Sequence, residues 1–286
     1  MKIKSILLAS IIIATISCSK KDDPIVTQDT STISTAGDDV ATTFFPNILL
    51  NSWTFASTTT IVTPTPANGT LPTTATDVLR IDADVIENSI AYKIMKTSPA
   101  NPMGFYCNMV NNNKLRVVGS SVKMTGNINF NVSSNPIMFS VKDFTIFKEN
   151  AVAGTEVGIA NGIFDTTIQA SNGSAVPVSG NYNIKSVADV SLASLVVGNI
   201  TYNDVKKTII TINITGNANL GTTSIAALLA QDVVVSTQYY AKGVGVIKAE
   251  TIIKYEFAPT VASLFPATVS TTGRQDITEN LTSKTF

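Results

Sequence analysis

The sequence predicts an all-β protein with a minor α content: a large curved antiparallel sheet, folded as a half-barrel or a sandwich, with at most one or two short helices. Three observations lead to this prediction. Apolar and polar residues alternate with a period of two along many segments of the 286-residue chain, helical patterns are scarce, and no shift in composition divides the body. Hydrophobic residues make up 44% of the chain, enough to bury a sizeable core.

The composition also excludes several classes of function. Lys plus Arg and Asp plus Glu both number 20, so the chain has no excess of basic residues that would attract nucleic acid. It contains no His, which removes Ser-His-Asp catalysis, imidazole metal ligands and His-based pH switching. We therefore predict a non-enzymatic protein without a catalytic residue, cofactor, metal centre or nucleic-acid partner.

Residues 1–17 have the pattern of a secretory signal peptide. Lys2 and Lys4 form a short basic region, and an apolar run extends over residues 7–16. Ten residues of helix rise about 15 Å, half of the roughly 30 Å hydrocarbon core of a bilayer. The run is too short to span a membrane, so a cleaved leader is the better interpretation.

The end of this leader resembles a bacterial lipobox. Residues 15–18 read Thr-Ile-Ser-Cys, with Thr in place of the usual Leu, and Ser-Lys-Lys-Asp-Asp follows at 19–23. These residues are similar to the start of Bacteroidota surface lipoproteins. The resemblance implies lipid attachment at Cys18, with acyl chains such as palmitate, and a cell-surface location on the outer membrane. For the charged residues alone, an ordinary solvated tether is the alternative.

Residues 18–43 are predicted to be the lipidated Cys and a flexible tether, and residues 44–286 a single β-rich domain. Asp38 and Asp39 belong to the tether and are expected to be solvated. Ordered structure is predicted to begin with the apolar residues 44–50 and with Trp53, which we place in the core. Residues 57–77 contain three prolines and many threonines, so they are predicted to be a loop.

The strands of the body follow from alternation. Residues 117–132 are predicted to form one long strand bent at Gly126, and residues 137–147 a strand with a β-bulge near Lys142 and Asp143, where the parity changes. Residues 224–231 are predicted to be a short helix. Further strands are expected near 181–192, 208–214, 232–240 and 245–257, and residues 187–197 favour strand because many are β-branched.

Residues 239–248, Tyr-Tyr-Ala-Lys-Gly-Val-Gly-Val-Ile-Lys, resemble a hairpin of secreted β-rich lipoproteins with LolA-like half-barrels, although the Pro often seen before the Gly is missing. Lys242 and Gly243 are predicted to form its tight turn, so Gly243-Val244-Gly245 is a hairpin and not a dinucleotide fingerprint. The resemblance implies a concave sheet that offers a hydrophobic ligand an apolar cavity. Tyr239, Tyr240 and Tyr255 are the candidate ligand-facing residues.

Two further groups of side chains could carry chemistry. Cys107 shares its parity with apolar neighbours and is expected to be an inert core thiol, with a nucleophile as the alternative. Asp82, Asp84 and Glu87 form the densest acidic cluster, and we expect a solvated strand face. A Ca²⁺ site or a glycosidase carboxylate pair is the alternative for this cluster.

Weaker motifs also occur. Asp165-Thr166-Thr167 resembles the O-glycan acceptor triplet of Bacteroidota exported proteins. The Asn-x-Ser/Thr triplets are expected to reflect composition; they begin at Asn68, Asn131, Asn172, Asn199, Asn213 and Asn280. Three functions stay open: a non-enzymatic binding or structural module for a hydrophobic ligand, a glycan-binding or adhesin subunit of an outer-membrane complex, and a carboxylate-dependent glycan hydrolase.

Overall fold

The computed structural model of the chain describes residues 43–64, 72–130, 137–171, 173–262, 264 and 270–286. The chain divides into two compact units, Met1–Ile33 and Ser34–Phe286, and all described residues belong to the second. The predicted signal peptide, Cys18 and the tether up to residue 42 lie outside the described residues. None of the described helices is long and apolar enough to cross a membrane.

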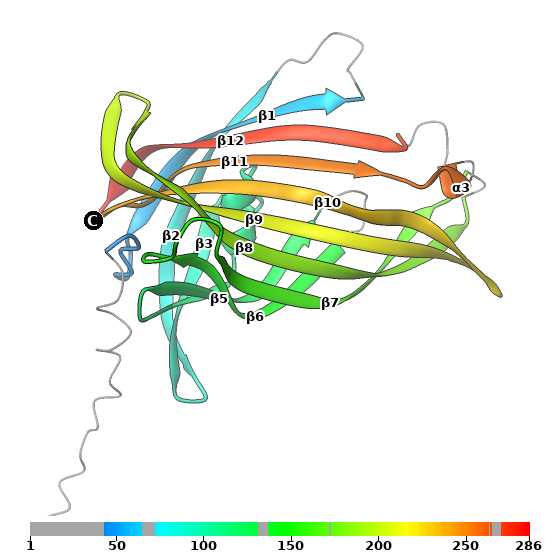
Figure 1. Cartoon of the computed structure of the whole chain (residues 1–286), viewed down its shortest axis with the longest axis horizontal. Helices are drawn as coiled ribbons and strands as arrows, with labels where there is room; N and C mark the ends of the chain where they lie inside the picture. Colours follow the sequence, from blue (N-terminus) through cyan, green and yellow to red (C-terminus); the bar gives the residue numbers. More distant parts are fainter. Residues whose placement is uncertain (1–42, 65–71, 131–136, 172, 263, 265–269) are drawn as a thin grey trace, which may run out of the picture. The chain divides into compact units, whose positions relative to one another are not determined.

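The described part of the chain is built on one antiparallel sheet of twelve strands (Figure 1). Its spatial order is β6-β5-β4-β3-β2-β1-β12-β11-β10-β9-β8-β7, so consecutive strands are neighbours in the sheet except β6 and β7, which form its two edges, and β1 pairs with β12. The strands are β1 (Ser52–Thr63), β2 (Thr73–Glu87), β3 (Ile90–Ser98), β4 (Lys114–Val118), β5 (Ser121–Phe130), β6 (Ile137–Lys148), β7 (Glu156–Gln169), β8 (Ala175–Val197), β9 (Ile200–Leu220), β10 (Thr223–Ala241), β11 (Gly245–Glu256) and β12 (Thr272–Thr285).

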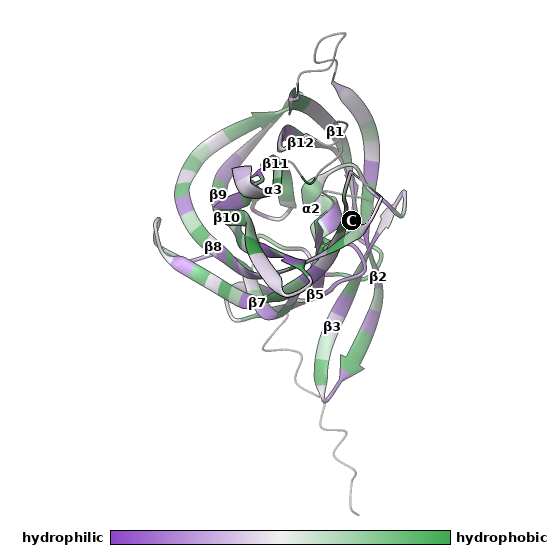
Figure 2. Ribbon diagram, turned by 90° about the vertical axis from the view of Figure 1, so that its right-hand side faces the viewer, coloured by the Kyte–Doolittle hydropathy of each residue, from purple (hydrophilic) through white to green (hydrophobic). Residues whose placement is uncertain are grey.

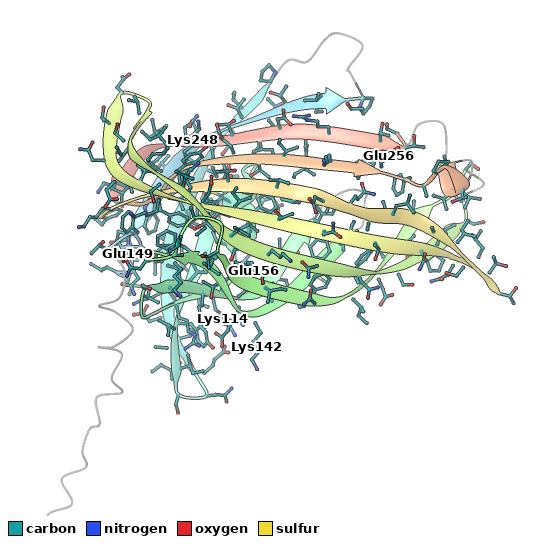
Figure 3. The ribbon with its side chains drawn as sticks, viewed as in Figure 1. Lys114, Lys142, Glu149, Glu156, Lys248 and Glu256 are labelled. Atoms are coloured by element: carbon teal, nitrogen blue, oxygen red, sulfur yellow. The ribbon has the colours of Figure 1, made fainter. Side chains whose placement is uncertain are left out.

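The alternation in the sequence gives this sheet an apolar inner face and a polar outer face. In β9, Ile210, Ile212 and Ile214 are fully buried on the inner side, and the residues between them point outward. In β11, Lys248 and Glu256 occupy outward positions near its two ends (Figure 3). An all-β protein with a large curved antiparallel sheet is confirmed.

The sheet curls until its two edge strands, β6 and β7, meet. No backbone ladder joins them among the described pairs. Two side chains of β8, the neighbour of β7, reach across to β6: the Tyr182 hydroxyl donates to the Ser140 carbonyl at 2.7 Å, and the Ser186 hydroxyl donates to the Thr145 carbonyl. A Cβ at Gly158 would lie 2.4 Å from the Thr145 carbonyl oxygen, so only glycine permits this close approach. The architecture is therefore a nearly closed barrel, which excludes the sandwich.

A short helix, α2 (Phe105–Val110), lies inside the ring of strands (Figure 2). Five of its six side chains are buried, including Phe105, Tyr106 and Cys107, so this helix fills the interior. The expected strand parity around Cys107 was wrong, although its burial is confirmed. Periodicity could not identify the helix, because an element that is apolar on every side shows no amphipathic period.

Two boundaries differ from the predicted ones for simple reasons. Residues 117–132 are not one strand: β4 ends at Val118, and Gly119, with φ +56°, opens a tight turn into β5. A two-residue turn shifts the parity, so Val117 faces inward together with its partner Val122. Because Val117 and Val118 are both apolar, the alternation in the sequence does not reveal this shift. Residues 57–77 are not all loop, since β1 and β2 extend into them, and the three prolines lie between the strands.

The predicted irregularities are confirmed. One register shift of the β5–β6 pair contains both positions: it lies between Met124 and Gly126, whose φ is +146°, and opposite Asp143, whose φ is +52°. The predicted turn at Lys242 and Gly243 joins β10 to β11, and Gly243 has φ +70°. The predicted strands near 181–192, 208–214, 232–240 and 245–257 fall within β8, β9, β10 and β11, which also make 187–197 a strand.

The short helix predicted over residues 224–231 was wrong, because this segment is the start of β10. The β10–β9 register shifts between Ala226 and Leu228 and again between Leu228 and Gln231. These bulges bring the adjacent residues Ala227 and Leu228 both into the core. Adjacent buried positions interrupt the period of two and imitate helical spacing.

The other described helix, α3 (Pro259–Ala262), lies at the far end of the barrel from the chain entry at residue 43 (Figure 1). Its buried residue is Val261, and the Ala258 amide donates to the Ala227 carbonyl at 2.8 Å. These contacts hold the segment against β10. The helix α3 therefore borders one mouth of the barrel, whereas α2 lies in its interior.

Candidate functional site

The three candidate tyrosines do not converge on one site. Tyr240 faces inward, where its ring stacks on Phe147 with centroids 4.2 Å apart and its hydroxyl donates to Gln238 at 2.7 Å. Tyr239 faces outward, and its hydroxyl donates to the Glu250 carboxylate at 2.7 Å. Because the two are adjacent on β10, they lie on opposite faces of the sheet. Tyr255 lines a pocket near the α3 end of the barrel.

This pocket, which we call the mouth pocket, lies where β1, β11 and β12 approach the α3 end of the barrel. It has a volume of about 200 Å³. Ile61 and Ile253 share the inward-facing parity of their strands with the buried residues Phe55 and Ala249. Its lining residues are Ile61, Thr63, Ile253, Tyr255, Gly273, Arg274 and Gln275. The mouth pocket is therefore part of the concave inner surface.

Glycine makes room for the aromatic ring of the mouth pocket. A Cβ at Gly273 would lie 2.3 Å from the Tyr255 ring, so Tyr255 covers the backbone of β12 directly. The ring also meets Phe257 edge-on, with centroids 5.4 Å apart. Burial raises the pKa of Tyr255, so its phenol stays neutral. The mouth pocket thus combines aliphatic and aromatic surface with neutral polar groups, while the guanidinium of Arg274 at its rim pairs with Asp276 at 2.9 Å.

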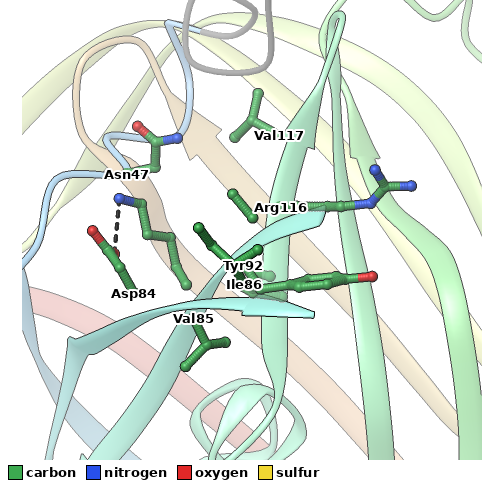
Figure 4. Close-up of a pocket in the computed structure, with 10 residues that line it drawn as sticks. Asn47, Asp84, Val85, Ile86, Tyr92, Arg116 and Val117 are labelled. Atoms are coloured by element: carbon green, nitrogen blue, oxygen red, sulfur yellow. Dashed lines mark ion pairs between the residues drawn. The ribbon is translucent and has the colours of Figure 1, made fainter. Parts of the chain in front are cut away.

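Asp82, Asp84 and Glu87 do not form a joint site. Asp82 pairs with Arg80 and with Lys96, whose Nζ lies 3.5 Å away. The carboxylate of Asp84 pairs with Lys93 at 2.9 Å beside a second pocket of about 220 Å³ (Figure 4). Glu87 pairs with Lys114 at 2.5 Å. Each carboxylate thus has its own cation, as expected for a partly solvated strand surface and not for a shared Ca²⁺.

A different acidic pair lies inside the barrel, next to Cys107. Asp77 of β2, Glu279 of β12 and Cys107 place one ligand-type atom each within 4.8 Å of one another, and all three residues are buried. Asp77 shares its parity with Leu79 and Ile81, and Glu279 lies between two buried apolar positions of β12. We missed this pair in the sequence. A charged residue on an apolar parity is the signal that could have found it.

These carboxylates hold the start of α2. Glu279 Oε2 accepts from the Tyr106 amide at 2.7 Å, and Oε1 accepts from the Cys107 amide at 2.9 Å. Asp77 accepts from the amides of Met103 at 3.1 Å and Gly104 at 2.8 Å, and from the Ser57 hydroxyl at 2.5 Å. The first amides of a helix have no partners within it, so hydrogen-bond acceptors placed there stabilise it. This arrangement is structural: every carboxylate oxygen has a backbone donor.

Burial dominates the electrostatics of this cluster. Burial raises the pKa of Glu279 to about 7, against the opposing effect of the two amides that donate to it. Burial, together with the nearby Glu279 and Asp77, raises the pKa of the Cys107 thiol well above its usual range. The thiol is therefore protonated at neutral pH, as expected for an inert core cysteine.

The raised pKa of Glu279 makes the stability of the protein depend on pH. Because the folded state binds this proton more tightly than the unfolded chain, the stabilisation is complete below about pH 4.5 and is lost as the pH rises through about 7. The loss amounts to about 3 kcal/mol. Urea denaturation from pH 4.5 to pH 8 would measure it. Glu279→Gln should remove most of this change of unfolding free energy with pH, whereas the control Glu156→Gln on the outer face should keep it. If Glu279→Gln kept the same pH dependence as wild type, the assignment to Glu279 would be refuted.

The remaining predicted motifs take ordinary places. Trp53 is buried, as predicted, and its Nε1 donates to the Val244 carbonyl at 2.6 Å. Asp165-Thr166-Thr167 lies on β7 with Asp165 exposed. Asn199 lies in the turn between β8 and β9, Asn213 on β9 and Asn280 on β12. Asn68, Asn131, Asn172, Asp38 and Asp39 lie outside the described residues.

No protein-family model and no curated protein matches the chain. Two solved structures are similar to it. "A putative lipoprotein from Parabacteroides distasonis ATCC 8503" shares 11% identity at a TM-score of 0.30, over 85% of this chain and 99% of that chain. A LolA superfamily protein from Nitrosomonas europaea shares 9% identity at a TM-score of 0.19, over 90% of this chain and 92% of that one. These TM-scores are too low to assign a family or a function.

Proposed function

We propose that this protein is a lipoprotein anchored to the outer membrane through an acylated Cys18, exposed at the cell surface, and that it acts as a non-enzymatic binding module. Its ligand is a molecule with an apolar end, and the mouth pocket receives that end. One observation carries the proposal: Ile61 points inward, toward the core side of the sheet, and yet 47% of its surface is exposed.

The contrast with the rest of the inner face supports a binding surface. Around α2, the inward residues Phe55, Leu79 and Met95 are at most 1% exposed. At the mouth, Ile253 and Tyr255 are only partly buried. An apolar inner wall that stays open to water gains free energy when an apolar group covers it, at about 25 cal/mol per Å².

The size of the mouth pocket limits what it holds. Pockets that enclose a whole small-molecule ligand measure roughly 300–1,000 Å³, and this one measures about 200 Å³. It therefore fits one segment of a longer molecule, such as the end of an acyl chain. Gln275 and Thr63 line the same pocket and supply polar contacts for a neighbouring carboxylate or ester, whereas the guanidinium of Arg274 pairs with Asp276.

The hydrolase alternative lacks a usable carboxylate pair among the described residues. Asp77 and Glu279 lie close together, but both are fully buried and both accept backbone hydrogen bonds. A glycosidase requires its two carboxyl groups in an open cleft on either side of the substrate. The binding module is therefore the function that we propose, and the absence of catalysis is part of that proposal.

Photolabelling tests this function. Membranes that carry the full chain would be irradiated with a diazirine-bearing fatty acid, and mass spectrometry would locate the label. We expect label on peptides that contain Ile253, Tyr255 and Gln275. Ile61→Lys should reduce it about tenfold, since a buried ammonium opposes an acyl chain by at least the 1.4 kcal/mol that a factor of ten represents.

The matched control is Ile163→Lys, which makes the same change on β7 at a position that is 76% exposed. It should leave the labelling of the mouth-pocket peptides unchanged. Equal labelling of these peptides in wild type and Ile61→Lys would contradict the proposed site.

A further inference from the structure

A second apolar surface lies at the opposite end of the barrel. Ile48, Leu49 and Leu50, which we call the apolar loop, are 67%, 42% and 63% exposed. Among the described residues, this is the one run of three consecutive large apolar side chains that are exposed. Single exposed apolar residues, such as Ile163 on β7, are ordinary, whereas a contiguous apolar surface indicates an interaction site.

The fold holds the apolar loop in this exposed position. Phe44 and Phe45, just before it, are buried in the core. The Leu50 amide donates to the Ile81 carbonyl at 3.0 Å, and the Asn51 amide donates to the Ile48 carbonyl at 3.1 Å. Leu50 also has φ +70°, an unfavourable conformation for a residue with a side chain. The structure therefore displays these side chains to solvent in a conformation that local preference opposes.

The surroundings of the apolar loop carry little net charge. Residues 43–51 contain no Asp, Glu, Lys or Arg. A shallow hollow of about 730 Å³ lies beside the loop, and its two charged residues, Asp84 and Lys93, pair with each other. Ile86, 61% exposed, lines the adjoining pocket (Figure 4). A neutral apolar surface fits the interior of a lipid layer better than a charged partner.

The position of the apolar loop in the chain selects the partner. The loop lies where the chain enters the barrel, at the end opposite to α3 (Figure 1). The segment between Cys18 and Thr43 would span roughly 25–30 Å as a random coil. An acylated Cys18 therefore keeps the apolar loop close to the bilayer surface, at a high effective concentration relative to the lipids.

We propose that the apolar loop inserts into the bilayer that holds the acylated Cys18. The inference rests on the lipid anchor of the proposed function. Side chains of this kind enter the boundary between headgroups and acyl chains, about 5–10 Å deep. The barrel then stands on the membrane by this end, and the mouth pocket at the α3 end points away from the bilayer.

Fluorescence quenching tests the insertion. The full acylated chain, carrying Leu49→Cys labelled with the fluorophore NBD, would be reconstituted into phosphatidylcholine vesicles with or without doxyl-labelled phosphatidylcholine. Acylation blocks Cys18 and burial protects Cys107, so the label is specific. We expect doxyl lipid to reduce the emission about twofold at position 49, as for a group in the interfacial layer. The matched control, Ile163→Cys on β7, should stay unquenched.

Other outcomes would overturn the insertion. If the NBD group at position 49 emits as in water and is not quenched by doxyl lipid, the loop stays outside the bilayer. Shielding from water without lipid quenching, increasing with the ratio of protein to lipid, would show that a second copy covers the loop. A failed anchor is distinguished independently, because the full chain would then leave the membrane fraction, as is expected of Cys18→Ala.

Discussion

Glu279→Ala is expected to lower the free energy of unfolding by about 4 kcal/mol. The carboxylate accepts hydrogen bonds from the amides of Tyr106 and Cys107 in a fully buried site. Its removal leaves two buried donors without a partner, each worth about 1–3 kcal/mol, and adds a void. Urea denaturation at a single pH below 7 would measure the loss as a lower midpoint with an unchanged slope.

Glu156→Ala is the matched control for this change. Glu156 is an exposed acidic residue that pairs with Lys185 at 3.2 Å. Exposed pairs contribute about 0–1 kcal/mol, so this variant should unfold close to wild type. If Glu279→Ala were as mild as Glu156→Ala, the buried carboxylate would not be holding α2.

Gly104→Ala should destabilise the protein to a similar extent, about 4 kcal/mol. A Cβ at Gly104 would lie 2.0 Å from Glu279 Oε1 and 2.2 Å from its carboxyl carbon. Gly104 has φ −67°, so the requirement for glycine here is space and not backbone freedom. Either α2 shifts or the carboxylate abandons its two amides, and both outcomes are costly in a packed core. Denaturation midpoints would show the loss.

A double variant separates this mechanism from general overpacking. In Gly104→Ala with Glu279→Ala, the methyl group enters space that the carboxyl group has vacated, so the combined loss should be well below the sum of the two single losses. Gly216→Ala is the control, since its Cβ would make ordinary contacts at 3.5–3.6 Å. It should change stability by at most about 1 kcal/mol. Additive losses at Gly104 and Glu279 would refute the proposed steric coupling.

The buried carboxylates that hold α2 were not predicted from the sequence. Asp77 and Glu279 lie on strands distant in the chain, and each is one charged residue on an apolar parity. They act together only because β2 and β12 both flank β1 in the barrel and because α2 enters the interior between them. Period-two patterns identify which face a residue occupies, but they carry no information about what lies across the core.

Local patterns, in contrast, predicted local structure well. The turn at Gly243, the irregularity at Asp143 and the bend at Gly126 were all predicted, because each depends on a few adjacent residues. The predictions of secondary structure failed where two different structures produce the same pattern of apolar residues. Val117 and Val118 are both apolar and conceal the change of parity at the Gly119 turn, the bulges near Ala227 and Leu228 imitate helical spacing, and α2 is buried at five of its six positions.

The candidate site divides in the same way. Parity alone placed Tyr239 and Tyr240 on opposite faces of the sheet. That Tyr255 meets Ile61 in one pocket, while Tyr240 packs against Phe147, depends on which strands adjoin it and on how far the sheet curls. The exposure of Ile48, Leu49 and Leu50 likewise required the structure, since the sequence predicted only that ordered structure begins in this apolar run.

The sequence by itself determined that the body of this protein is antiparallel sheet with one apolar face, because side-chain alternation is a property of the strand. Only the tertiary structure decided that the sheet closes almost to a barrel, that a helix held by two buried carboxylates fills it, and that apolar surface stays open at both ends. These features arise from contacts between residues far apart in the chain, where geometric fit and the cost of burying a charge outweigh local preference.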